Sequence, residues 1–141
     1  MDMAFGDRIR EKRTSLGYSQ QKLAEKAGIS LRSIQNYESN QRYPNNINIV
    51  KNIAVALGTT AEFLMAEEDA YIISAAEKGG SAARRDVEGL LGDLNALFAG
   101  GGMSPEDKDK VMRAIMDIYW ESKNEKGKGT PNKYRKEDSQ S

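Results

Sequence analysis

The stretch of residues 20–38, with the sequence QQKLAEKAGISLRSIQNYE, constrains the fold of this chain more than any other. Its first half places Leu23, Ala24 and Ala27 on one side of a short helix. Gly28 follows where that helix must end, because a residue without a Cβ takes the left-handed conformation of a helix C-terminus at little cost. The small side chain at position 24 lets a second helix cross closely. The stretch therefore predicts two short helices joined by a tight turn.

The second half of this stretch predicts a helix that presents one side to solvent. Ser30 is a suitable N-cap, because its hydroxyl can accept a free backbone N–H of the next turn. Ile34 and Tyr37, three residues apart, are expected to face the core together with Ile29 in the turn. The residues near or on the outer side of this helix are Leu31, Arg32, Ser33, Gln35 and Asn36.

Three further helices are expected to share a core with these two. Residues 4–16 alternate apolar and charged side chains at helical spacing. INIVKNIAVALG, residues 47–58, supplies another apolar stripe that ends at a glycine. Thr60 then caps a short fifth helix that carries Phe63 and Leu64.

This pattern resembles the helix-turn-helix of the Cro/C1-type (XRE) family of phage and bacterial repressors, over about residues 5–65 and including the ending GTTAEFLM. The positions that match the family are Gln20, Ala24, Gly28, Ile29, Ile34 and Tyr37. The resemblance implies a five-helix, lambda-repressor-like DNA-binding domain over residues 1–66. With the apolar stripes that follow it at helical spacing, the sequence predicts an all-α chain with a C-terminal helical (hairpin) region.

Composition excludes several other classes of function. The chain of 141 residues has no cysteine and no histidine, which removes disulfides, thiol chemistry, the usual general base and the commonest transition-metal ligand. No paired-carboxylate or glycine-rich phosphate motif is present, so we expect no enzyme activity, cofactor or bound metal. No apolar run approaches the roughly 20 residues that cross a bilayer, and no signal core follows Met1, so we expect a cytoplasmic protein.

The distribution of charge is uneven although the net charge is zero. Residues 1–65 carry a net charge of +3, residues 66–122 one of −6, and residues 123–141 one of +3. This asymmetry suits a DNA-binding head joined to a module with another task.

The resemblance assigns DNA contacts to named residues. An α-helix fits the major groove, where each base pair presents a distinct set of donors, acceptors and methyl groups. The positions that match the family's base-reading residues are Leu31, Arg32, Ser33 and Asn36. The positions expected to contact the sugar-phosphate backbone are Gln20, Ser30, Gln35, Asn40, Gln41, Arg42 and Tyr43. The alternative is that these residues form an ordinary polar surface without a role in DNA binding.

A structural ion pair is implied by the same resemblance. Similar repressors pair an arginine late in the first helix with a glutamate that ends the recognition helix, and here those residues are Arg13 and Glu38. The alternative is two unrelated surface charges.

The C-terminal half leaves two alternatives open. Residues 67–80 form a linker or a connecting helix, residues 81–122 contain two amphipathic helices, and residues 123–141 are expected to be a flexible basic tail. The apolar stripes either pack on the N-terminal core or pair with a second subunit, and we favour dimerisation. The residues expected to mediate it are Val87, Leu90, Leu91, Leu94, Leu97, Phe98, Ile115 and Tyr119.

These observations predict a sequence-specific DNA-binding transcriptional regulator, a repressor that binds a two-fold DNA operator as a homodimer. The alternative from another class is a protein-interaction module, such as the antitoxin of a toxin-antitoxin pair, with DNA binding secondary. Salt-dependent binding to the upstream DNA would distinguish them. We expect no membrane partner.

Overall fold

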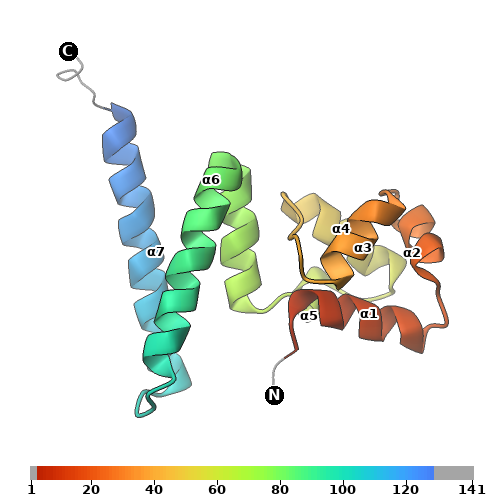
Figure 1. Ribbon diagram of the computed structural model, residues 1–141, viewed down its shortest axis with the longest axis horizontal. Coiled ribbons are helices and arrows are strands. Elements are labelled where there is room, and N and C mark those ends of the chain that lie inside the picture. The colour runs from red at the N-terminus through yellow and green to blue at the C-terminus, as the bar shows by residue number, and fades with distance from the viewer. Residues whose placement is uncertain (1–2, 129–141) are drawn as a thin grey trace. The chain divides into compact units, whose positions relative to one another are not determined.

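The structure, a computed structural model, describes residues 3–128, with side chains through residue 124. Seven helices and no strand make up this part of the chain (Figure 1). The helices are α1 (Phe5–Ser15), α2 (Gln20–Ala27), α3 (Leu31–Glu38), α4 (Ile47–Ala56), α5 (Ala61–Leu64), α6 (Glu67–Phe98) and α7 (Pro105–Lys128). The fold is all-α, as predicted, with five short helices followed by a C-terminal helical region. The chain divides into two compact units, residues 1–89 and 90–141.

Side-chain caps set the start of four of the five short helices. The side chains of Ser19, Ser30, Asn46 and Thr60 each accept a backbone N–H from the first turn of α2, α3, α4 and α5, respectively. Such caps satisfy amides that have no partner within the helix. They also begin each helix at a defined residue, so that its apolar side faces the shared core.

The core of the first unit collects apolar side chains from α1 to α5. Its largest fully buried members are Phe5, Ile9, Leu23, Ile34, Val50, Ile53, Leu57 and Leu64. Ile73 of α6 belongs to the same core. The predicted connecting segment therefore packs on the N-terminal helices as a helix.

Two features of α6 bear on the predicted divisions. Its backbone is non-helical at Gly80, where φ is 71° and ψ is −160°, and this conformation bends the helix. Glycine tolerates a positive φ because it has no Cβ. The division between the compact units falls after Gly89. The predicted boundaries were at residue 66 and residue 80. The non-helical Gly80 lies at the second of these, whereas the first compact unit includes residues 67–89.

In the second unit, a side-chain cap and a proline mark the start of α7. The Ser104 hydroxyl accepts the backbone N–H of Asp107 at 3.2 Å, and Pro105 is the first helical residue. Leu91, Phe98, Met112 and Met116 are buried.

The predicted tail begins too early in the sequence. Helix α7 continues through Lys128, so residues 123–128, expected to be flexible, are helical. The stretch NEKGK after Lys123 contains no proline and includes Glu125, Lys126 and Lys128, which are good helix formers, so the helix can continue despite Gly127. The remainder of the predicted tail, residues 129–141, lies outside the described residues.

Candidate nucleic-acid interface

The turn between α2 and α3 fixes how α3 is presented. Gly28 is left-handed, with φ 70° and ψ 32°, and the next amide, of Ile29, donates to the carbonyl of Ala24 at 3.1 Å. The Ser30 hydroxyl accepts the amide of Ser33 at 3.0 Å and so caps α3. Ile34 is fully buried. These contacts hold α3 by its inner side and leave its outer side to solvent.

The predicted base-reading residues differ in how far they project. Arg32 is exposed, whereas Leu31 and Asn36 are half-buried, and Leu31 packs against the core. Ser33 is also half-buried, and its hydroxyl accepts a hydrogen bond from Ser30 at 2.9 Å. Arg32 is therefore the cationic group that α3 presents most openly.

Tyr37 sits behind this side of α3. Burial raises the pKa of its hydroxyl, while a hydrogen bond with Ser33 and the charge of Arg42 act in the opposite direction. The Ser33 hydroxyl, near the outer side of α3, therefore already has hydrogen-bond partners within the protein.

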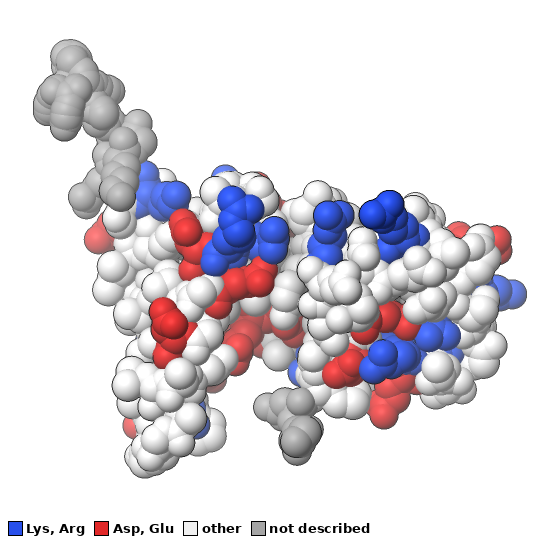
Figure 2. All heavy atoms as spheres, in the orientation of Figure 1, with Lys and Arg blue, Asp and Glu red and all other residues white. Residues whose placement is uncertain are grey.

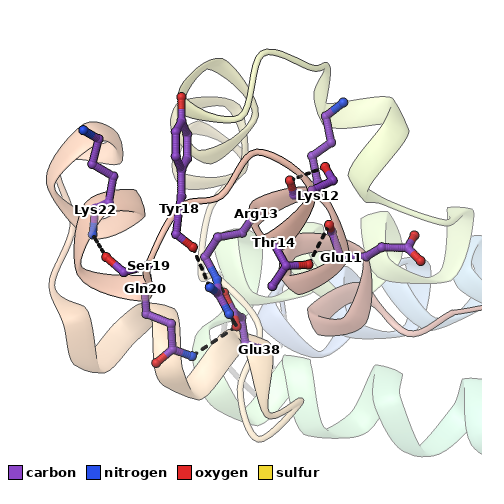
Figure 3. Close-up of polar contacts among 10 residues, drawn as sticks. Glu11, Lys12, Arg13, Thr14, Tyr18, Ser19, Gln20, Lys22 and Glu38 are labelled. Carbon is purple, nitrogen blue, oxygen red and sulfur yellow. Dashed lines mark hydrogen bonds and ion pairs between the residues drawn. The ribbon is translucent and has the colours of Figure 1, made fainter.

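A partly buried cluster of three side chains joins α1, α2 and α3 (Figure 3). Arg13 donates from Nε to Glu38 Oε2 at 2.6 Å and from Nη2 to Glu38 Oε1 at 2.8 Å. Arg13 Nη1 donates to the carbonyl of Tyr18 at 2.8 Å. Gln20 Nε2 donates to Glu38 Oε1 at 3.1 Å. The structure therefore brings the two predicted ion-pair residues together, with Gln20 as a third member.

The electrostatics of this cluster favour the charged pair. Glu38 is 2% exposed, so its carboxylate needs the donors that surround it. Hydrogen bonds from Arg13 to Glu38 raise the pKa of the Arg13 guanidinium, burial opposes that shift, and the charge of Glu38 adds to it. Three donors on one carboxylate lock the C-terminal end of α3 to α1 and to the start of α2.

Gln20 keeps a donor for a second partner. A side-chain amide has two N–H hydrogens, and Glu38 takes one of them. The other hydrogen, together with the free amides at the start of α2, remains suited to a phosphate oxygen.

Two residues of the loop after α3 that are predicted DNA contacts, Asn40 and Tyr43, also have partners within the protein. Asn40 has a positive φ of 62°, and its Oδ1 accepts the amide of Gly6 at 2.9 Å. Its side chain thus faces the start of α1. Tyr43 stacks on Phe5 and donates its hydroxyl to Asp69 at 2.8 Å. The sequence did not predict these partners, because they lie far away along the chain.

Other predicted backbone contacts remain open to solvent. Ser30, Gln35, Gln41 and Arg42 are exposed. Arg42 is the cation among them, and it follows Gln41 directly in the loop between α3 and α4. These residues stay candidates for phosphate contact.

The sequence analysis missed Asp69, which ties α6 to the head. Asp69 is 6% exposed and accepts from Arg8 Nη1 at 3.0 Å, from Tyr43 and from the amide of Ala66 at 2.8 Å. Burial and then the Asp69 carboxylate raise the pKa of the Tyr43 hydroxyl. The acidic start EEDA was the available signal, because an acid at the third helical position often caps the helix N-terminus.

Charge is not spread evenly over this unit. Figure 2 shows Lys and Arg side chains over α3 and over the bend of α6, with acidic side chains lower on α6. On α1, acidic and basic side chains lie next to one another.

The predicted dimerisation residues fall into two groups. Val87, Leu91 and Phe98 are buried within the single chain. They cannot contact a second subunit without an opening of the helices. Leu97 is 72% exposed, and the residues that are half-buried are Leu90, Leu94, Ile115 and Tyr119. Ile118, which the sequence analysis did not select, is 60% exposed.

These contacts and this fold define a helix-turn-helix DNA-binding domain. A helix-turn-helix family model matches residues 9–64. The chain is 32% identical to YonR, an SPbeta prophage-derived HTH-type transcriptional regulator of Bacillus subtilis, over 77% of this chain and 88% of the relative. It is 31% identical to the immunity repressor protein of Bacillus phage phi105, over 96% of this chain and 99% of the relative.

Among solved structures, the restriction-modification controller protein C.AhdI from Aeromonas hydrophila is 33% identical, with a TM-score of 0.42. That match covers 43% of this chain and 91% of the controller protein. The sequence relatives show that the chain belongs to the XRE family of helix-turn-helix transcriptional regulators. It is a DNA-binding transcriptional regulator. Within residues 3–128, no helix combines the length and apolarity needed to cross a bilayer.

Proposed function

We propose that this protein is a cytoplasmic repressor that binds a two-fold DNA operator as a homodimer and has no catalytic role. The observation that supports the proposal is that α3 is fixed to the protein and exposes its outer side to solvent. Arg32 and Gln35 are exposed on this helix, while Arg13 and Gln20 hold its far end through Glu38. A recognition helix held in this way can enter the major groove without first becoming ordered.

The repressor assignment is supported by the relative from phage phi105, which is named an immunity repressor and aligns over nearly its whole length. Repression by occupancy needs tight binding at one DNA site. A single α3 reads only a few base pairs, so specific affinity usually requires two half-sites about one helical turn apart. A symmetric dimer supplies the second recognition helix.

The second compact unit is the proposed dimerisation region. Leu97 and Ile118 are large apolar side chains with more than half of their surface exposed. Exposed apolar surface of this kind favours association, since burial removes it from water. We propose that these residues, with the half-buried Leu94 and Ile115, pack against the same region of a second copy.

The test is a binding assay with the protein's own upstream DNA at increasing salt concentration. We expect a specific shift whose affinity falls as salt rises, because phosphate contacts release counterions. Selection of bound sequences from a random pool should return a two-fold site. The absence of any shift at low salt would instead favour a protein-interaction module of the antitoxin type.

A further inference from the structure

An open hollow of about 680 Å³ lies between α3, the loop after it and the bend of α6. Ser33 lines it from α3, and Arg42 lines it from the loop. Glu77, Ser81 and Arg84 line it from α6. All of these residues belong to the first compact unit. The hollow therefore begins beside the recognition helix and ends on a helix outside the helix-turn-helix domain.

The walls of the hollow are polar and carry two cations. Arg42 is exposed, and Arg84 is partly exposed and donates to Glu88 at 2.8 Å. A pair spaced four residues apart on one helix contributes little when its side chains reach solvent, and here 26% of the Arg84 side chain and 38% of the Glu88 side chain are exposed. The guanidinium of Arg84 can therefore turn to a stronger anion at small cost. Arginine has five N–H donors and matches the geometry of phosphate oxygens.

One wall already holds an anion. The backbone amide of Ile47, at the start of α4, donates to Glu77 Oε2 at 2.6 Å. The Asn46 side chain caps the same helix end by accepting the amide of Ile49 at 3.1 Å. The start of α4 thus attracts negative charge, as the dipole of a helix N-terminus predicts. In the free protein, the carboxylate of Glu77 satisfies that preference.

We propose that this hollow receives the sugar-phosphate backbone of the bound DNA, so that Arg84 adds a phosphate contact from α6. The inference rests on the proposed function, and it extends the DNA surface beyond residues 9–64. Two observations favour the DNA backbone as the occupant of the hollow. The hollow is continuous with α3 and the Arg42 loop, and the basic side chains in Figure 2 lie over α3 and over the bend of α6.

Glu77 then acts as an internal competitor of the DNA phosphate. A phosphate in the hollow meets the carboxylate at close range, and like charges at that range repel. Glu77 has to release the amide of Ile47 or bear that repulsion when DNA binds. Removal of its charge should therefore strengthen DNA binding, whereas removal of the charge of Arg84 should weaken it.

The experiment measures the affinity of the full-length protein for a short random-sequence duplex at several salt concentrations. We expect Arg84→Ala to lose roughly tenfold in affinity at low salt, as for a hydrogen bond to a charged group. Its salt slope should become shallower by about one unit. Arg85→Ala is the matched control, because Arg85 is an exposed neighbour that does not line the hollow.

The opposite change uses Glu77→Gln, which keeps the shape of the side chain and removes its charge. We expect affinity to rise by several-fold at low salt, and Glu62→Gln on α5 controls for the loss of one negative charge elsewhere in the unit. Thermal melting of each variant checks that it folds. If Arg84→Ala fails to fold, the sign of the Glu77→Gln effect decides alone.

The inference is overturned if Arg84→Ala binds like the parent, if Arg85→Ala loses as much, or if Glu77→Gln binds no better than Glu62→Gln. A parent protein that binds no DNA at low salt overturns the proposed function and this inference together. A parent that binds DNA while both hollow variants match their controls overturns this inference alone.

Discussion

Arg13 of α1 and Glu38 of α3 form a bidentate ion pair, with N–O distances of 2.6 Å and 2.8 Å, and neither side chain is more than 11% exposed. Removal of one partner leaves the other largely buried without its counter-charge, which costs about 3–5 kcal/mol. We therefore expect Arg13→Ala and Glu38→Ala each to lower the stability substantially. The double variant should lose less than the sum of the two.

The measurement is a double-mutant cycle by denaturant unfolding. A coupling energy of about 0.5–3 kcal/mol is expected for a pair in direct contact. The exposed pair of Asp7 and Arg10, at 2.9 Å, is the matched control, and its coupling should stay below about 1 kcal/mol. Equal coupling in the two cycles would mean that the buried pair does not hold α3 in place.

Arg32 is predicted to determine sequence preference. Its side chain is exposed on α3, and a guanidinium can contact O6 and N7 of guanine together. Arg32→Ala should lose about 1–3 kcal/mol of discrimination at one base pair and much less affinity for random DNA. Competition binding with a panel of operator variants measures this. Arg10→Ala on α1 should rank the panel as the parent does, and an identical ranking by Arg32→Ala would exclude it from base reading.

Self-association is predicted to depend on exposed apolar residues of the second unit. Leu97→Asp or Ile118→Asp should shift the protein from dimer to monomer and weaken operator binding, because each places a charge in the proposed interface. Sedimentation equilibrium with operator titration checks both effects. Val55→Asp is the control, since Val55 is 79% exposed on α4 in the first unit. A monomeric parent would contradict the proposal directly.

Gly6→Ala tests the close approach of α1 and α3. A Cβ at position 6 would clash with the carbonyl oxygen of Tyr37 and would lie 2.9 Å from that of Glu38. Both are backbone atoms that cannot move independently of α3. We expect the free energy of unfolding to fall by about 1–3 kcal/mol, as is usual when a core is overpacked. The coupling energy between Arg13 and Glu38 should also become smaller. Gly92→Ala is the control, because no atom beyond its chain neighbours and its own helix backbone lies within 4 Å of the added Cβ, and it should not lower the stability.

What the sequence by itself determined was mostly local. Ser19, Gly28 and Ser30 set the bounds of α2 and α3, because caps and left-handed glycines act within one turn of the helix. Helical spacing likewise marked Leu23 and Ile34 for the core. The family resemblance added Arg13 and Glu38, which spacing alone could not pair.

The tertiary structure alone decided which partners the polar side chains take within the protein. Asn40 and Tyr43, which stay predicted contacts of the DNA backbone, bond to Gly6 and Asp69. Those partners lie more than twenty residues away in sequence, and no local pattern encodes them. Glu77 reaches the start of α4 only because α6 packs on the head through Ile73. Burial of that apolar surface places the acidic residues of α6, and it depends on the whole core rather than on any segment.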